Sequence, residues 1–257
     1  MGLLVKARNK LSLPVGYALI GRRKGDRFLA SFPRSGSTWL RTILVNIMVP
    51  GANSDPEVFN EVIPGVSIRN APAIRGLPSP RIIHGHTCYR NEIERAIYTV
   101  RDGRDALVSF YHYLTTRRGI SMPFDKWFSK YERHEYGPTW DEHVRSWFVT
   151  GARALGDDLL IVRFERMKAE PVETVMDICV HLALDADVAQ VESAVKMASI
   201  ENARKIERRR VGSGASGDAS FYRGGKTGQW QEYLTGAVAD RFWGRSEASM
   251  GLAGYGR

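Results

Sequence analysis

Apolar residues gather in four short runs along the chain, at 28–32, 81–84, 96–101 and 158–164. The runs AIYTVR and DLLIVRF consist almost entirely of β-forming residues, the pattern of strands that are buried on both faces. Segments with helical periodicity lie between and after these runs, near 38–48, 103–116, 123–133, 139–154 and 171–183. Strands that alternate with helices predict an α/β fold in which helices flank a parallel β-sheet. Ligands of such a sheet bind at the carboxyl ends of its strands.

Two segments show no sustained period. Residues 50–80 contain six prolines, and residues 211–228 are rich in glycine and serine. Long irregular loops in compact domains are usually functional. Because no internal repeat or domain boundary is visible, we expect a single domain over 28–257, preceded by an arm at 1–27.

The positive charge of the chain is concentrated in this arm. Residues 1–27 contain seven basic residues and one acidic residue, which gives +6 of the total net charge of +9. The remainder is close to neutral, which argues against a nucleic-acid-binding surface. A solvated basic arm is the simplest interpretation, and weak contact with a membrane surface or an acidic partner is the alternative.

The remaining composition favours a cytoplasmic protein. Pro14 and Gly16 interrupt the apolar stretch 11–21, and no small-x-small cleavage site follows it, so we do not interpret it as a signal peptide. No stretch has the length of a membrane span. The two cysteines, Cys88 and Cys179, form no metal-binding or redox pattern, which fits a reducing compartment.

The first candidate site is the segment SFPRSGSTWLR, residues 31–41, which follows the first predicted strand. Its small polar residues can offer hydroxyl and backbone N–H groups to a phosphate at a helix N-terminus. These residues are Ser35, Gly36, Ser37 and Thr38. The usual nucleoside-triphosphate loop ends in Gly-Lys-Ser/Thr, but here Arg34 supplies the cation from a position before the glycine. The alternative is a turn followed by a helix that Ser37 or Thr38 caps.

The second candidate site is the segment AIYTVRDGRDALVSFYHY, residues 96–113. Arg101 ends a predicted strand, where ligands of parallel sheets bind. Ser109 follows eight residues later on the predicted helix. For Asp102, Arg104 and Asp105 we favour the ordinary interpretation of a charged helix start.

The third candidate site is the segment RIIHGHTCY, residues 81–89, in which His84 and His86 lie two positions apart and face the same side of an extended chain. A metal site is disfavoured because no third ligand follows at a useful spacing. A neutral imidazole near the strand ends could serve as a general base. A structural role is the alternative.

Together these segments resemble the cytosolic-type sulfotransferases, which use 3′-phosphoadenosine-5′-phosphosulfate (PAPS) as the sulfuryl donor. The family's phosphosulfate loop reads roughly Tyr-Pro-Lys-Ser-Gly-Thr-Thr-Trp, and FPRSGSTW matches it with Arg34 in place of the lysine. RDGRDALVS matches the family's 3′-phosphate segment. His86 matches the catalytic histidine, and His84 stands where the family often has lysine. FYRGGKTGQW, residues 221–230, resembles a C-terminal loop, with Gly224 replacing a lysine.

The resemblance implies a donor site and a set of roles. The residues from Arg34 to Thr38 would hold the 5′-phosphosulfate, and Trp39 would contact the adenine. The 3′-phosphate would be bound by Arg101, Ser109 and Arg223, and Gly224 and Gly225 would also belong to the donor site. Phe164 stands where the family has a donor-contacting tyrosine, although the last core residue of a strand is an equal interpretation. The family's dimerisation motif is poorly kept, so the sequence leaves the oligomeric state open.

The resemblance also implies the reaction, transfer of a sulfuryl group to a hydroxyl or amine of a small molecule by in-line displacement. His86 would be the general base, Arg34 would neutralise the leaving phosphate, and no metal would be needed. An ATP-dependent kinase and a non-catalytic nucleotide-binding module are the alternatives.

The sequence does not identify the acceptor. Aromatic residues of the segments 50–80 and 114–140 could line its pocket or belong to the core. They are Phe59, Phe124, Trp127, Phe128, Tyr131 and Tyr136.

Overall fold

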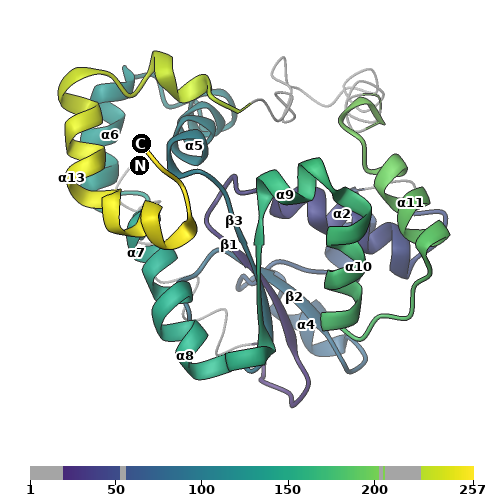
Figure 1. The fold of residues 1–257 in the computed structure, drawn as a ribbon. Coiled ribbons are helices and arrows are strands. Elements are labelled where there is room, and N and C mark those ends of the chain that lie inside the picture. Colours follow the sequence, from purple (N-terminus) through teal and green to yellow (C-terminus); the bar gives the residue numbers. More distant parts are fainter. Residues whose placement is uncertain (1–19, 53–55, 203–204, 206–226) are drawn as a thin grey trace.

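Four parallel strands form the sheet of the computed structural model, which describes residues 20–52, 56–202, 205 and 227–257 (Figure 1). The strands are β1 (Arg27–Ser31), β2 (Ile82–Gly85), β3 (Ala96–Val100) and β4 (Leu159–Arg163). They lie in the order β2-β1-β3-β4, and every neighbouring pair is parallel. Ala30 is in register with both Gly85 and Tyr98, so the carboxyl ends of the three strands lie at one edge of the sheet.

The strand order places a switch point next to β1. The chain leaves β1 toward β2 on one side and later returns to β3 on the other side. Ligands of open α/β sheets bind at the carboxyl ends of the strands where the winding direction changes in this way. The loop after β1 and the loop after β3 are therefore the expected binding elements.

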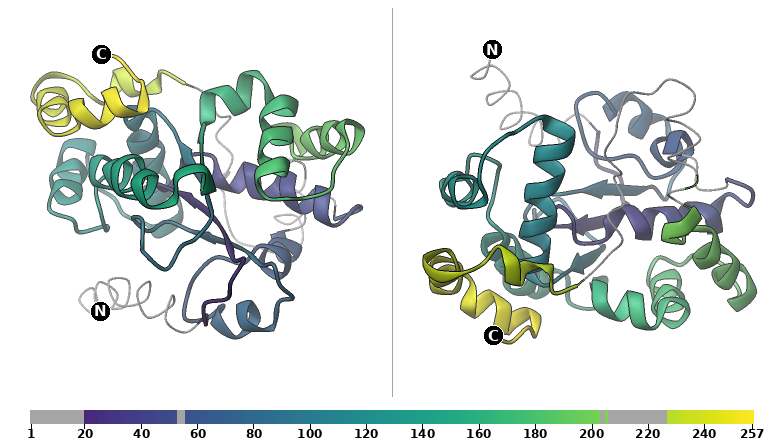
Figure 2. Two further views of the ribbon diagram at one scale, coloured as in Figure 1. Left: turned by 60° about the horizontal axis from the view of Figure 1, so that its bottom comes forward. Right: turned by 90° about the horizontal axis from the view of Figure 1, so that it is seen from above.

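Helices cover both faces of the sheet (Figures 1 and 2). One layer contains α5 (Gly103–Arg118), α6 (Phe124–Glu132), α7 (Trp140–Arg145) and α13 (Gly236–Ala253). The other contains α2 (Ser37–Met48), α3 (Pro56–Val62), α10 (Pro171–His181) and α11 (Val188–Met197). Successive strand residues feed opposite cores, as the alternation of side chains along a strand requires. Tyr98 packs in the first core and Ile97 in the second.

Short elements complete the described chain. They are α4 (Ala71–Gly76), the π-helix η1 (Ser146–Gly151), α8 (Ala152–Leu155), the 3₁₀ turns η2 (Gly156–Asp158) and η3 (Gln229–Glu232), and α9 (Phe164–Ala169). In Figure 1, α5 and α9 lie beyond the carboxyl ends of the strands, next to the loop that leads into α2.

The predicted strands are confirmed, each within one residue of its expected bounds. The prediction of an irregular segment at 50–80 is wrong in part, because α3 and α4 form there. Both helices carry a proline in the first turn, where proline is tolerated since its missing N–H would have no helical partner. The helix predicted at 139–154 is interrupted by η1. Helices α11 and α13 were not predicted from the sequence.

Candidate active site

The loop between β1 and α2 makes a tight turn, and helix α2 begins directly after this turn. The Ser35 N–H donates to the Phe32 carbonyl at 3.2 Å, and Gly36 precedes α2 with a φ of 93°. Because no side chain caps the helix, the capping alternative for Ser37 and Thr38 is wrong. The buried Ser35 hydroxyl has no hydrogen-bond partner within the part of the chain that the structure describes. A helix N-terminus beside a spare hydroxyl fits an anion.

Arg34 extends from this loop to helix α5. Its Nε donates a hydrogen bond of 3.2 Å to the Ser109 hydroxyl. The guanidinium also lies over the Tyr113 ring, 5.3 Å from the centroid. Arg34 has a φ of 70°, which is unusual for a residue with a side chain. Two of the predicted site residues, separated by 75 positions in the sequence, are therefore in direct contact.

Arg101 reaches the same place from the end of β3. Its Nη1 donates to the Arg34 carbonyl at 3.4 Å, and its guanidinium stacks over the Phe164 ring at 4.8 Å. Burial lowers the pKa of Arg101, while the neighbouring Asp105, 3.7 Å away, raises it. Since arginine titrates far above neutrality, Arg101 stays a cation. The loop, the end of β3 and α5 thus bring two arginines and Ser109 together.

Phe164 and Trp39 form an aromatic wall beside the loop. Phe164 is the first residue of α9, and its buried ring meets the Trp39 ring edge-to-face at 6.1 Å. The structure accordingly brings both residues next to the loop. Gly36 lies against the same wall, where a Cβ atom would approach Cδ2 of Phe164 to 2.5 Å.

Gly36→Ala should destabilise the protein. Overpacking against Phe164 costs about 1–3 kcal/mol, and a left-handed backbone costs a residue with a Cβ roughly 1–2 kcal/mol more. The measurement is the free energy of unfolding in urea. Gly25→Ala is the matched control, because Gly25 has a similar φ of +86° but no atom within 4 Å of an added Cβ. Equal losses in the two variants would show that the contact with Phe164 is unimportant.

The two predicted histidines lie side by side at the end of β2. Their ring centroids are 4.6 Å apart, at an interplanar angle of 88°. The Nδ1 atom of His86 lies 2.8 Å from the Ser31 carbonyl oxygen. Because a carbonyl only accepts, Nδ1 carries the proton of the neutral ring and Nε2 keeps a free electron pair. His86 therefore has the tautomer that a general base needs.

The surroundings keep both rings neutral. Burial lowers the pKa of His86 from its usual value of 6.5, and the cations Arg41 and Arg34 add to this, while the Ser31 carbonyl acts in the opposite direction. Burial and the neighbouring His86 hold the pKa of His84 well below 6.5. His84 is only 8% exposed. His84 is therefore a buried ring that is uncharged near neutrality.

The start of α5 serves two purposes. Asp102 caps the helix by accepting the Arg104 N–H at 2.9 Å, as expected for a charged helix start. Asp105 was assigned the same ordinary role, but its carboxylate lies beside Arg101 and also accepts the Gly228 N–H at 3.0 Å. No local pattern predicts this contact, because Gly228 lies 123 positions further along the chain. Arg223, Gly224 and Gly225 lie outside the described residues.

The aromatic residues considered for an acceptor pocket are mostly core residues. Five of them, Phe59, Phe124, Trp127, Phe128 and Tyr131, are at most 9% exposed. Tyr136 is half-buried and stacks on the Trp127 ring at 5.9 Å. For these five side chains the structure favours the core interpretation, because they belong to the buried clusters on the two faces of the sheet.

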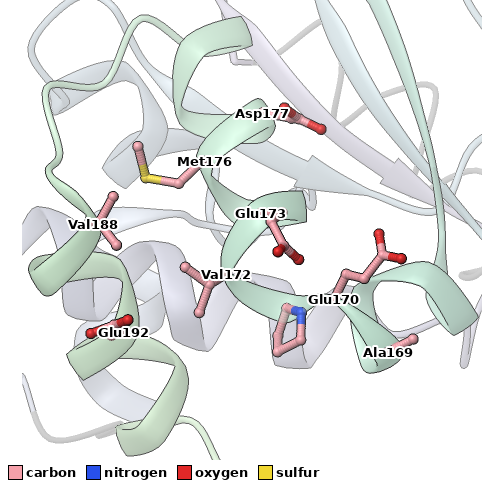
Figure 3. A pocket seen from close by; sticks show the side chains of 9 residues that line it. Ala169, Glu170, Val172, Glu173, Met176, Asp177, Val188 and Glu192 are labelled. Atoms are coloured by element: carbon pink, nitrogen blue, oxygen red, sulfur yellow. The ribbon is translucent and has the colours of Figure 1, made fainter.

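A surface hollow of about 650 Å³ lies between α10 and α11 (Figure 3). Its rim carries the carboxylates of Glu170, Glu173, Asp177 and Glu192, and none of the predicted site residues lines it. Clustered carboxylates repel an anionic ligand. The loop after β1, with its arginines and helix N-terminus, is the better anion site.

Two further features of the described segments concern metal binding and membrane insertion. The described segments contain no group of three or more His, Cys, Asp or Glu side chains that could hold a metal ion. None of the helices in these segments is long and apolar enough to cross a bilayer.

Known proteins are similar to the chain in sequence and in fold. Residues 24–254 match the sulfotransferase domain family. An amine sulfotransferase from Oryctolagus cuniculus is 25% identical over 241 residues, covering 86% of this chain and 79% of the relative. Cytosolic sulfotransferase 13 from Arabidopsis thaliana is 26% identical over 243 residues, covering 85% of this chain and 74% of the relative.

Solved structures agree with the predicted architecture. A mouse sulfotransferase in complex with PAP (3′,5′-adenosine bisphosphate) superposes with a TM-score of 0.69 at 20% identity, over 94% of both chains. A retinol dehydratase in complex with retinol and PAP gives a TM-score of 0.70 at 17% identity, over 90% of this chain and 82% of the other. The parallel α/β fold is therefore confirmed. Since the family match spans nearly the whole chain, the protein is a member of the sulfotransferase family of enzymes.

Proposed function

We propose that the protein transfers a sulfuryl group from PAPS to a hydroxyl or amine group of a small molecule. The convergence of Arg34, Arg101 and Ser109 beside the anion-binding loop carries this proposal. A donor with a second phosphate needs a second cationic position, and Arg101 supplies one at the end of β3. PAP, 3′,5′-adenosine bisphosphate, is the product that such a donor leaves.

The donor roles are assigned by position. The loop from Arg34 to Thr38 holds the 5′-phosphosulfate, with the helix N-terminus and the spare Ser35 hydroxyl as support. Arg101, Ser109 and Arg223 hold the 3′-phosphate, and Gly224 and Gly225 of the C-terminal segment also belong to the donor site. The aromatic wall of Trp39 and Phe164 suits the adenine ring, which stacks well on aromatic side chains.

The chemistry is an in-line displacement at sulfur. The acceptor oxygen or nitrogen forms a bond to sulfur while the bond from sulfur to the phosphate oxygen breaks and PAP departs. The acceptor proton passes to Nε2 of His86, which is free because Nδ1 faces the Ser31 carbonyl. Arg34 and the loop N–H groups stabilise the charge that grows on the leaving phosphate.

Arg101→Ala should weaken PAP binding by about 1.5–3 kcal/mol, the range for a hydrogen bond to a charged group. AMP binding should change much less, because AMP lacks the 3′-phosphate. Calorimetry with both nucleotides gives the two affinities. The role of Arg101 would be refuted if the variant lost PAP and AMP affinity to the same extent.

The acceptor class rests on the relatives. The curated relatives include an amine sulfotransferase and a flavonol 4′-sulfotransferase, and one solved relative is a complex with retinol. We extend from these only the class of a small molecule with a hydroxyl or amine group.

The rival functions fit the site less well. A kinase would need a lysine in the loop and an acidic residue at the end of β3, where the chain has Arg34 and Arg101. A non-catalytic nucleotide-binding module would not need His86 in the tautomer of a general base. Both alternatives predict no sulfated product.

The test of the function is an incubation of the protein with ³⁵S-labelled PAPS and pools of phenols, alcohols and amines. We expect label in at least one small-molecule product and an equal amount of PAP. PAPS binding without turnover on every pool would favour the non-catalytic module. The setting we propose is a reducing cytoplasm, since Cys88 and Cys179 are free thiols and cytosolic sulfotransferases are among the relatives.

A further inference from the structure

The chain that follows His86 is held by the π-helix η1. The indole N–H of Trp147 donates to the Thr87 carbonyl at 3.0 Å. The Tyr89 N–H donates to the Ser146 hydroxyl at 3.0 Å, and the Tyr89 ring packs edge-to-face on Trp147 at 5.5 Å. Two neighbouring residues of η1 thus bind the backbone on the carboxyl side of His86.

Trp147 is held in place by buried aromatic side chains. Trp147 is fully buried and stacks on Tyr98 of β3, with ring centroids 5.2 Å apart and an interplanar angle of 9°. The Tyr98 hydroxyl lies 2.9 Å from Nδ1 of His143. Burial, the largest effect, and the neighbouring His86 lower the pKa of His143 to about 3, although the backbone of His86 and Thr87 acts in the opposite direction. His143 is therefore neutral, and it forms an uncharged hydrogen bond with the Tyr98 hydroxyl.

Both side chains that reach this backbone come from the first two residues of the π-helical turn. α7 ends at Arg145, and η1 then runs from Ser146 to Gly151 before α8 begins. Ser146 also donates its hydroxyl to the His143 carbonyl at 2.8 Å, so the same side chain joins the helix to the segment after β2. Single π-helical turns are rare and occur often at functional sites.

We propose that Trp147 and Ser146 are positioning residues that fix the orientation of His86 by binding the backbone at Thr87 and Tyr89. The Ser31 carbonyl holds one side of the His86 ring through Nδ1. The contacts from η1 hold the main chain at Thr87 and Tyr89, which follows His86 directly. This inference rests on the proposed role of His86 as the general base, because a base misplaced by about 1 Å can lose up to roughly 10²-fold in rate.

The test is a double-mutant cycle between Trp147→Phe and His86→Ala. Phenylalanine keeps an aromatic ring on Tyr98 but has no N–H for the Thr87 carbonyl. We expect Trp147→Phe to lower kcat by about 10- to 100-fold and to leave the affinity for PAP unchanged. In the His86→Ala background, the same substitution should cause no further loss, measured in single turnovers with labelled PAPS.

Trp127→Phe is the matched control. Trp127 is also fully buried, but its indole N–H has no hydrogen-bond partner among the described residues. We expect this variant to keep wild-type kcat even if its free energy of unfolding falls as much as that of Trp147→Phe. If Trp147→Phe does not fold, Ser146→Ala replaces it in the cycle, because it removes the other contact at a smaller cost in packing.

The outcomes are separable. Equal fold losses in the wild-type and His86→Ala backgrounds would overturn the inference, since the effect would not pass through His86. Wild-type kcat in folded Trp147→Phe and Ser146→Ala would overturn it too. Wild-type kcat in His86→Ala alone would instead refute the proposed base, and the inference would fall with it.

Discussion

His86→Ala should lower kcat by about 10²- to 10⁴-fold, the usual contribution of a general base. The reason is the tautomer, because Nδ1 of His86 donates to the Ser31 carbonyl and leaves Nε2 free to accept the acceptor proton. The affinity for PAP should be retained, since the phosphate contacts come from other residues. The measurements are kcat with labelled PAPS and calorimetry with PAP.

His84→Ala is the control for this prediction. The two rings touch, but His84 is almost fully buried and neutral. Its removal should lower the free energy of unfolding and reduce kcat less than His86→Ala does. Near-normal turnover in His86→Ala together with an inactive, folded His84→Ala would show that the base is the other histidine.

The pH dependence follows from the same ring. A protonated imidazole cannot accept a proton, so kcat should fall as pH drops through the pKa of His86. Burial, Arg41 and Arg34 place that pKa below 6.5, and His84 beside the ring is neutral as well. We therefore expect a flat rate around neutrality and a loss that begins only in acid. A rate that already falls between pH 8 and 7 would contradict a lowered pKa.

Arg34→Ala should lower kcat by about 10²- to 10³-fold, the cost of removing one donor from a site of developing negative charge. Its effect on PAP affinity should be smaller, because the charge on the phosphate grows only as the bond to sulfur breaks. The Ser109 and Tyr113 contacts hold the guanidinium at this position. The comparison is between single-turnover rates and calorimetric affinities.

Arg34→Lys is the matched control. It keeps the charge and gives the residue that is usual in the resembled family, so it should retain much of the activity. It loses the planar Nε donor to Ser109, which predicts a moderate loss. A fall in PAP affinity that accounts for the whole rate loss of Arg34→Ala would assign Arg34 to binding alone.

The fold could be predicted from local patterns. The strands are runs of β-forming residues, and the loop after β1 combines glycine, hydroxyls and a basic residue within a few positions, so both were visible in the sequence. α13 was missed because Gly244 and Gly251 interrupt its helical pattern, and glycine lowers helix propensity. Its burial against α7 compensates for this, and such contacts are not visible in the sequence.

The site was only partly predictable, because several of its contacts are between distant residues. Asp105 looked like an ordinary helix-start charge, yet it binds the backbone of Gly228. Trp127 and Phe128 were compatible with a pocket and with a core, because a pocket lining and a core each place aromatic side chains on one face of a helix. The π-helix η1 could not be predicted, because the periodicity of residues 139–154 is that of one continuous α-helix.

Comparing the affinities of the wild-type protein for PAP and for AMP tests the assignment of PAPS as the donor. The two ligands differ only in the 3′-phosphate, which we assign to Arg101 and Ser109 beside the loop. A hydrogen bond to a charged group contributes about 1.5–3 kcal/mol, so calorimetry should show PAP binding about 10- to 150-fold more tightly. Equal affinities for PAP and AMP would contradict the assignment of PAPS as the donor.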